Sequence, residues 1–191
     1  MTDRTAIINL PNPHLRTPSK RVRVIGDEEK AIIKSMREAA LDWEDSRPHE
    51  IAVALAAVQI DQLVRIVIIR GDFDNKEDRN FIVLINPEIT KREGEIITDH
   101  EGCLSVKDVY GLVPRHSKIR VRALDESGQM IRIKAEGFLA RILQHEIDHT
   151  NGICFVDHIA DDKNAFYKLT EAGELESVSY DYVQQSHILR D

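Results

Sequence analysis

Apolar residues recur at helical spacing in two parts of the chain. The first part, residues 27–43, opens with three acidic residues, which suits a helix N-terminus, and its apolar positions share one face: Ile32, Ile33, Met36, Ala39 and Ala40. The second part starts near Gly137 and runs to the pair Asn151-Gly152, a combination typical of a helix C-terminus. These patterns predict two amphipathic helices, and we expect a third within residues 161–175.

Four further runs are typical of strands, at residues 63–70, 80–86, 118–124 and 129–135. The last two alternate apolar and polar positions and are separated by the tetrapeptide DESG, which indicates a hairpin. A group of strands followed by a late helix favours the α+β class over repeated strand–helix–strand units. We therefore expect antiparallel or mixed β-sheets packed around a central helix, with a further helix in the C-terminal tail.

Length and composition narrow the class of protein. A chain of 191 residues, 42% apolar and 31% charged, is expected to form one domain over residues 1–191 with a sizeable core. No apolar run reaches 18 residues and the N-terminus lacks an apolar signal core, so we expect a cytoplasmic protein without a membrane anchor. The net charge of −7 argues against a general nucleic-acid binder, and two cysteines do not suggest a disulfide scaffold.

The sequence HEIDH at residues 145–149 is the strongest chemical signal. Four residues of an α-helix turn through about 400°, so the His145 and His149 imidazoles lie about 40° apart and can hold one metal ion. Glu146 is rotated by about 100° from His145, which suits a base acting on water at the metal better than a ligand. The pattern therefore predicts a catalytic metal site on the second helix.

Two histidines leave such a site short of a third protein ligand. His158 and Glu171 lie downstream, at spacings that match no recognised zincin pattern. Upstream, Cys103 lies in the segment EGCLS, and a thiolate is a strong ligand for a borderline-soft divalent ion. Cys154 has apolar neighbours and is expected to be a small buried residue.

Three segments together resemble the motifs of the peptide deformylase family. AVALAAVQ at residues 52–59, EGCLS at 101–105 and QHEIDHTNG at 144–152 are similar to the family's GxGxAAxQ, EGCxS and QHExDHxxG, in that order. A looser resemblance extends from about residue 10 to residue 157. Three motifs in the same order, with similar gaps, are far more specific than any one of them.

The resemblance implies a reaction and a set of roles. Cys103, His145 and His149 would hold one divalent metal ion, Fe(II) in most of the family, with zinc, nickel or cobalt as substitutes. Glu146 would shuttle the proton, while the Gln59 side-chain amide and the Leu104 backbone N–H would stabilise the oxyanion. The implied reaction removes formate from the N-formylmethionine of newly made polypeptides.

The resemblance also implies supporting residues. Glu101 and Arg115 would form an ion pair that braces the segment bearing Cys103. The pocket for the methionine side chain would be lined by residues from the first motif and from the second helix: Val53, Ala54, Leu55, Phe138 and Ile142.

Departures from the family pattern leave alternatives open. Ala52 and Ala54 stand where the first motif has glycine, beside the expected peptide groove. A deformylase-like metal-binding protein without turnover is therefore one alternative, and an HExxH metallopeptidase is another. The acidic tail, about residues 161–191, would be repelled by ribosomal RNA, so ribosome docking is not carried over, and we expect a monomer.

Overall fold

The computed structural model describes residues 6–47, 50–170 and 173–190. Its centre is one seven-stranded sheet with the strand order β1-β2-β3-β4-β6-β7, while β5 pairs with another part of β4. The strands are β1 (Ala54–Ala56), β2 (Ile66–Arg70), β3 (Phe81–Cys103), β4 (Val106–Leu124), β5 (Met130–Glu136), β6 (Phe166–Leu169) and β7 (Leu175–Ser177). All these pairings are antiparallel.

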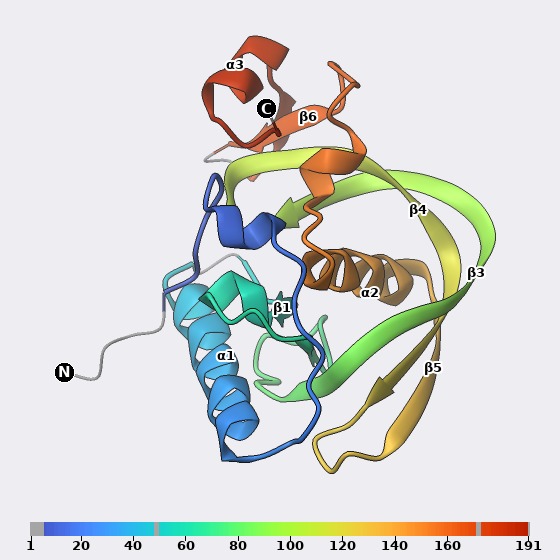
Figure 1. Cartoon of the computed structure of the whole chain (residues 1–191). Helices are drawn as coiled ribbons and strands as arrows, with labels where there is room; N and C mark the ends of the chain where they lie inside the picture. Colours follow the sequence, from blue (N-terminus) through green and yellow to red (C-terminus); the bar gives the residue numbers. More distant parts are fainter. Residues whose placement is uncertain (1–5, 48–49, 171–172, 191) are drawn as a thin grey trace.

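The helix α2 (Gly137–Thr150) lies inside the curve of the sheet, with the long strands β3 and β4 bending around it (Figure 1). Alternate positions of β4 and β5 face this helix, so Ile119, Val121 and Ala135 pack with Ala140 and Leu143 in one apolar core. Burial of apolar surface on both partners therefore holds the helix in the centre of the fold.

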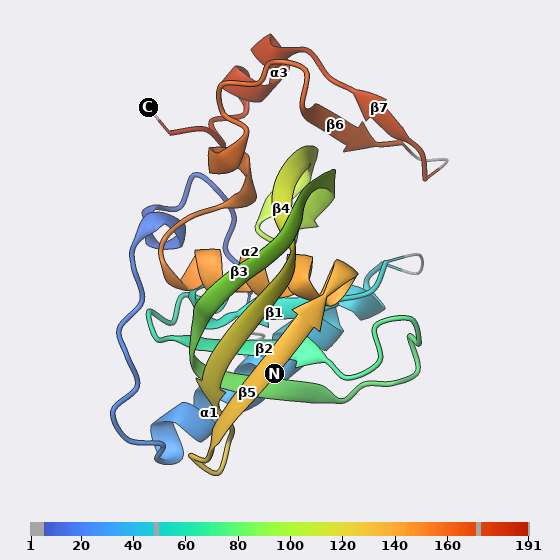
Figure 2. The ribbon, with the colours of Figure 1, turned by 90° about the vertical axis from the view of Figure 1, so that its right-hand side faces the viewer.

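The helix α1 (Asp27–Asp45) covers another face and packs Ile33, Met36 and Ala40 against Leu55 and Ile68 of β1 and β2. Three short 3₁₀ helices, Pro13–Arg16, Ala57–Ile60 and Phe155–His158, connect the larger elements. A third apolar core lies under β6, β7 and the helix α3 (Tyr180–Gln185), at the end of the molecule farthest from β5 (Figure 2).

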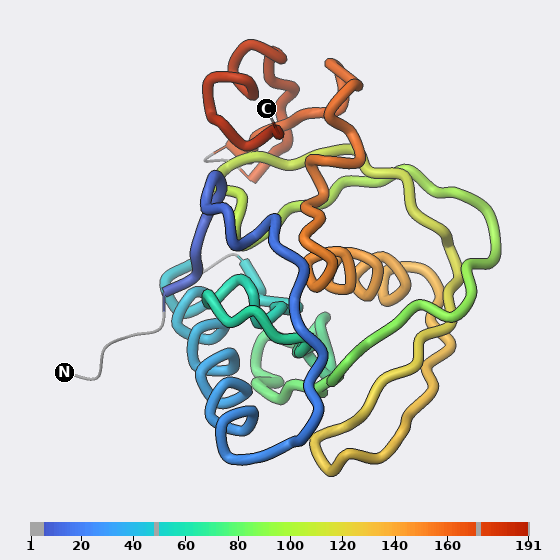
Figure 3. Tube along the Cα trace, in the orientation of Figure 1, coloured from blue at the N-terminus to red at the C-terminus, as the bar shows by residue number. Residues whose placement is uncertain are grey.

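The N-terminal segment runs across the molecule and touches three elements in turn (Figure 3). The backbone N–H of Ile8 donates to the carbonyl of Gln59, that of Leu10 to Ser105, and that of Ser19 to Thr150. These partners lie in the first motif, in the turn after Cys103, and at the end of α2. The segment therefore ties together the three parts of the chain that carry the motifs.

The α+β class, the central helix and the DESG hairpin are confirmed, since Leu124 pairs with Met130 across the predicted turn. The helix expected within residues 161–175 is wrong. Residues 166–169 form β6 because they pair with β4, and the C-terminal helix lies later, at Tyr180–Gln185. The candidate ligand Glu171 lies outside the described residues.

The segment 52–59 of the first motif is a strand only at Ala54–Ala56 and then turns into the 3₁₀ helix Ala57–Ile60. Its strand does lie at one end of the sheet. No helix in the described ranges is long and apolar enough to cross a membrane.

Candidate metal centre and active site

The buried helix α2 carries two of the candidate ligands. From Ala140 to Thr150 every side chain of this helix is buried, so its polar residues are surrounded by protein. The helix ends at Thr150, and Gly152 follows two residues later with a φ of +73°. A Cβ atom at Gly152 would lie 2.6 Å from the Arg16 carbonyl oxygen, so there is no room for a side chain. Steric constraints therefore explain why the third motif has glycine at residue 152.

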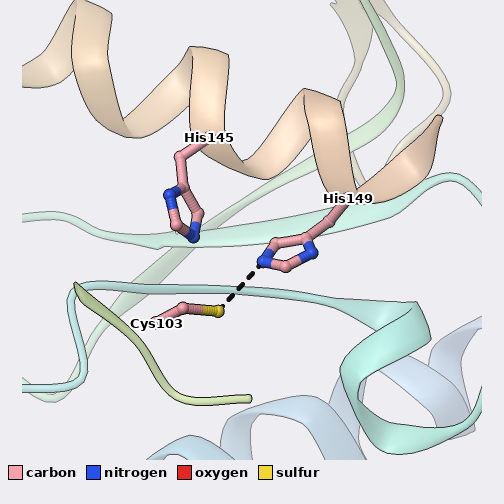
Figure 4. Close-up of side chains that lie close together, drawn as sticks. All are labelled: Cys103, His145 and His149. Atoms are coloured by element: carbon pink, nitrogen blue, oxygen red, sulfur yellow. Dashed lines mark hydrogen bonds between the residues drawn. The ribbon is translucent and has the colours of Figure 1, made fainter. Parts of the chain in front are cut away.

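The third candidate ligand comes from the tip of the β3–β4 hairpin. Cys103 is the last residue of β3, and its Sγ lies 3.2 Å from Nε2 of His149. The two imidazoles point from the helix toward this sulfur (Figure 4). One ligand atom from each of Cys103, His145 and His149 lies within 4.8 Å of the others. Cys103 lies more than forty positions before the two histidines in the sequence, and the fold brings all three together.

The donor chemistry of this cluster fits a divalent metal ion. A thiolate and two imidazoles are the ligands that zinc, iron and related ions accept in catalytic sites with an open position. Nδ1 of His145 lies 2.9 Å from a carboxylate oxygen of Glu101, which leaves the Nε2 atom of the ring free to face the cluster. A histidine oriented by a carboxylate in this way is the usual arrangement at metal sites.

The charges within the cluster favour a thiolate. Burial opposes ionisation of Cys103, but the adjacent His149 and His145 imidazoles outweigh it and lower the pKa of the thiol to about 5. Burial also opposes protonation of His145, yet the bonds to Cys103 and Glu101 raise its pKa to about 10. In the metal-free cluster these charges favour a thiolate beside protonated imidazoles, and a metal ion that binds there would displace the imidazole protons.

Glu146 lies beside the cluster and keeps one carboxylate oxygen free of hydrogen bonds to the described residues. Its side chain is buried, and Oε2 has no hydrogen-bond partner among the described residues. Burial raises the pKa of this carboxyl to about 7, the neighbouring imidazoles only partly opposing the rise. A carboxyl with this pKa exchanges a proton readily near neutral pH, as a general base must.

The Gln59 side chain has a fixed orientation. Its Oε1 accepts the backbone N–H of Ala56 at 2.8 Å, so the Nε2 group turns toward Ser105 Oγ at 3.1 Å and Cys103 Sγ at 3.6 Å. Leu104 follows Cys103 in the turn of the β3–β4 hairpin and lines the same cavity as Gln59. Both candidate oxyanion donors therefore lie next to the proposed ligand sulfur.

A cavity of about 890 Å³ opens at this cluster. Val53, Ala54, Phe138 and Ile142 line it together with Cys103, His145 and Glu146. Leu55 does not line it: this side chain is fully buried in the core under α1, because neighbouring residues of a strand point to opposite faces. The expected pocket role of Leu55 is therefore wrong.

Glu101 is the centre of a buried polar network. It accepts Arg115 Nε at 2.9 Å and Arg141 Nη1 at 2.7 Å, in addition to its contact with His145. Burial would raise the pKa of Glu101, but the bonds from His145 and Arg115 hold it far below the usual range. The expected Glu101–Arg115 ion pair is therefore present in the structure, with a second arginine added.

The network continues away from the cluster. Arg115 Nη1 donates to a carboxylate oxygen of Asp148, which also lies 2.7 Å from Nε2 of His158. His158 is thus used in this network and lies outside the group of candidate ligands. Sequence reasoning assigned no role to Arg141 and Asp148. Arg141 could have been found from its spacing, since it precedes His145 by one helical turn on the same face.

Steric constraints also explain the glycine of the second motif, Gly102. A Cβ atom at Gly102 would lie 2.5 Å from Cε1 of the Tyr110 ring. Tyr110 follows on β4 and lines the cavity, and its hydroxyl lies 3.5 Å from a carboxylate oxygen of Glu50. The close packing of this ring on Gly102 places Cys103 at the edge of the cavity.

Comparison with known proteins agrees with the fold and the site. Residues 5–165 match the family described as polypeptide deformylase. A peptide deformylase from Thermomicrobium roseum is 40% identical over 88% of this chain and 93% of its own length. Another, from Psychrobacter cryohalolentis, is 38% identical over 81% of this chain and 78% of its own.

Two solved structures are also similar. A peptide deformylase from Synechococcus elongatus, in complex with actinonin, superposes with a TM-score of 0.72 at 33% identity, covering 83% of this chain and 80% of the other. One from Acinetobacter baumannii, bound to Met-Ala-Ser, superposes with a TM-score of 0.71 at 30% identity, covering 83% of this chain and all of the other.

The curved antiparallel sheet around an HExxH helix, joined by an upstream cysteine, defines the class of metal-dependent hydrolases. Within that class, this chain belongs to the peptide deformylase family.

Proposed function

We propose that this chain removes the formyl group from N-formylmethionine at the N-terminus of newly made polypeptides and releases formate. The observation that carries the proposal is the Cys103–His145–His149 cluster in the wall of a large cavity, with Glu146 beside it, whose Oε2 has no hydrogen-bond partner among the described residues. The relatives named peptide deformylase support the same reaction.

Cys103, His145 and His149 would hold one divalent ion, for which we propose Fe(II), with Zn(II), Ni(II) and Co(II) able to replace it. When bound, such an ion supplies Lewis-acid chemistry, polarising a carbonyl and lowering the pKa of water. If iron is the native metal, activity should decay in air, and exchange for nickel should protect it. A stable iron form in aerated buffer would contradict this choice of metal.

Glu146 would move the proton. No group in the described part of the chain bonds its Oε2, so this oxygen can accept a proton from the attacking water and later deliver it to the leaving amine. The pKa of about 7 suits both directions of transfer at neutral pH.

Gln59 and Leu104 would stabilise the oxyanion formed from the formyl carbonyl. The amide of Gln59 cannot rotate freely, because its Oε1 is bonded to Ala56, so its Nε2 group is held ready as a donor. The backbone N–H of Leu104 would supply the second donor from the turn after Cys103.

The edge strand β1 would bind the peptide backbone. Arg70 N–H donates to the carbonyl of Val53, and Leu55 is opposite Ile68, so the backbone groups of Val53 and Leu55 face β2. Those of Ala54 then face the open edge, where an extended peptide can pair with them. The methionine side chain would lie against Val53, Phe138 and Ile142. The similar Acinetobacter baumannii protein bound to Met-Ala-Ser supports a peptide of this kind.

The two alternatives receive less support. A binding protein without turnover would have no use for an oriented Gln59 and an unpartnered Glu146. An HExxH endopeptidase would use a downstream third ligand, whereas the third residue of this cluster is the upstream Cys103. We further propose that the protein acts as a single-domain monomer in the cytoplasm, without ribosome docking through its acidic tail.

Formate release from formyl-Met-Ala-Ser, measured under anaerobic conditions with the iron-loaded protein, tests the proposal. We expect stoichiometric formate and free Met-Ala-Ser. Retention of bound metal with no formate from any formylmethionyl peptide would favour the binding protein, and cleavage of internal peptide bonds would favour the endopeptidase.

A further inference from the structure

The hairpin of β6 and β7 follows the part of the chain that matches the family, which ends at residue 165. It is attached to the sheet by the pairing of Tyr167 with Tyr110 and of Phe166 with Gly111. The hairpin lies beside the end of β4 and extends past it (Figure 2). Since β4 at Tyr110 is one wall of the active-site cavity, the hairpin continues that wall.

The two faces of the hairpin have different environments. Phe166 is fully buried in the third apolar core, packed with Val183, and this anchors the hairpin. The next residue, Tyr167, points to the opposite face, where its ring makes an edge-to-face contact with His100 at 4.7 Å between centroids. Leu169 lies on the same face two residues later, and Leu175 is its direct cross-strand partner.

Leu169 and Leu175 line the same cavity as Cys103 and Glu146. Leu169 is 36% exposed, and neither leucine belongs to the three apolar cores formed by the described residues. These two adjacent leucines face the cavity and do not pack into a core. A ligand that covers them breaks no core contact, and the burial of their apolar surface favours binding.

We propose that Leu169 and Leu175 form an apolar outer subsite for the third or a later residue of the formylated peptide. This inference rests on the proposed function. The formyl group must reach the Cys103 cluster, and the first side chain would lie near Val53 and Phe138. An extended chain advances about 3.4 Å per residue, so its later residues pass along the cavity toward the hairpin. The subsite makes the enzyme prefer apolar side chains there.

The test compares three substrates: formyl-Met-Ala, formyl-Met-Ala-Leu-Leu and formyl-Met-Ala-Ser-Ser. We expect the unmodified enzyme to show a kcat/KM three- to tenfold higher for the Leu-Leu peptide than for the Ser-Ser peptide. The double variant Leu169→Ser/Leu175→Ser should lose this preference, while its kcat/KM for formyl-Met-Ala stays within twofold. The matched control is Lys168→Ser/Glu176→Ser, which changes another cross-strand pair of the same hairpin and should keep the preference.

A Leu-Leu preference that survives in the Leu169→Ser/Leu175→Ser variant, or is absent from the unmodified enzyme, would overturn the subsite. Thermal unfolding followed by circular dichroism verifies that the variants are folded. Binding is measured separately from turnover, because the single tryptophan, Trp43, lines the same cavity and its fluorescence should respond to Met-Ala-Leu-Leu. Absence of formate from every substrate would count against the proposed function alone, and this titration would still decide the subsite.

Discussion

Nδ1 of His145 lies 2.9 Å from Oε2 of Glu101, and this contact decides which nitrogen of the ring faces Cys103. Glu101 also binds Arg115 and Arg141, so its position is fixed from three sides. Such a buried charge network contributes little net stability, because desolvation offsets its attraction, but it holds a ligand in a single orientation.

Replacing Glu101 by glutamine should therefore weaken metal binding. The neutral amide cannot accept from His145 and both arginines in the same way, so we expect a loss of about 10- to 100-fold in metal affinity. Competition with a chromogenic chelator measures it. Glu93→Gln is the matched control, since Glu93 pairs with Arg120 on the surface and should leave the affinity unchanged. Equal affinities for Glu101→Gln and the control would show that the contact does not orient the ligand.

Cys103→Ala should remove most of the bound metal, because the thiolate is the one anionic ligand of the cluster. Cys154→Ala should leave the metal in place, since Cys154 packs in the third apolar core. Metal content per chain, by atomic emission after gel filtration, gives the comparison. Equal content in the unmodified protein and Cys103→Ala would refute the ligand assignment.

Glu146→Ala should keep the metal and lose turnover. The three ligands are untouched, while the group that moves the proton is gone, and such groups are worth about 10²- to 10⁴-fold in rate. Formate release at saturating formyl-Met-Ala-Ser, normalised to metal content, measures the loss. A variant with more than half the original rate would show that another group moves the proton.

Glu146 also makes the metal-free protein sensitive to pH. Its pKa rises from 4.5 in the unfolded chain to about 7 in the folded one, so between these values the folded protein holds a proton that the unfolded chain has released. Stability contributed by the protonated carboxyl is therefore lost as pH rises toward 7. As the pH rises from below 4.5 to above 7, the free energy of unfolding of the unmodified protein should fall, relative to that of Glu146→Gln, by on the order of 3 kcal/mol.

Urea unfolding of both chelator-treated proteins at pH 5 and pH 8 measures this difference. The comparison with Glu146→Gln is needed because the Cys103 cluster titrates in both proteins, so the difference between them isolates the Glu146 carboxyl together with its coupling to that cluster. A gap between the two proteins that stays constant from pH 5 to pH 8 would contradict the raised pKa.

The alanines of the first motif should be compatible with catalysis. Left-handed φ values among the described non-glycine residues occur at Asp61, Asn86, Asp108 and His187, so Ala52 and Ala54 carry no such strain. Ala52 is fully buried, and its N–H donates to Glu44 Oε2 at 2.9 Å, so it does not reach the peptide edge. Ala54→Gly and Ala52→Gly should each change kcat/KM by less than about tenfold.

The larger of these two changes should come from Ala54→Gly, and it should be most evident with a bulky second residue in the peptide. Steady-state kinetics with formyl-Met-Ala-Ser and formyl-Met-Trp-Ser gives the ratio. Activity that appears only after Ala54→Gly would mean that the methyl group blocks the groove.

Periodicity alone was enough to place His145, Glu146 and His149 on one helix, because a buried helix repeats its contacts every turn. Periodicity could not supply Cys103, since nothing local to EGCLS shows that β3 returns to α2 at that residue. The ligand chemistry of a thiolate made Cys103 a candidate, and the resemblance to the family assigned it to the site. The resemblance also placed Leu55 in the pocket, but strand alternation puts its side chain on the other face, in the core under α1.

The long strands were only partly foreseen. Residues 87–117 were not predicted as strand. Many side chains from Glu88 to His100 are exposed on both faces of the strand, so the sequence there lacks the alternation of apolar and polar residues that marks a half-buried strand. Their pairing along the β3–β4 hairpin, with several register shifts, holds them instead. The helix expected near residue 166 failed for a related reason. Ala165, Phe166 and Leu169 have spacing compatible with a helix, but pairing with β4 overrides local preference.

The contact between Gly102 and Tyr110 has a consequence for variation within this protein. The aromatic ring fills the volume where a side chain at residue 102 would begin, so a Cβ atom there would clash with Cε1 of the ring at 2.5 Å. The substitutions that the two positions accept therefore depend on each other. A smaller residue at 110 opens space for alanine at 102. Alanine at 102 alone would clash with the ring, and a smaller residue at 110 alone would leave a void beside Cys103. A side chain at residue 102 thus requires a smaller residue at 110.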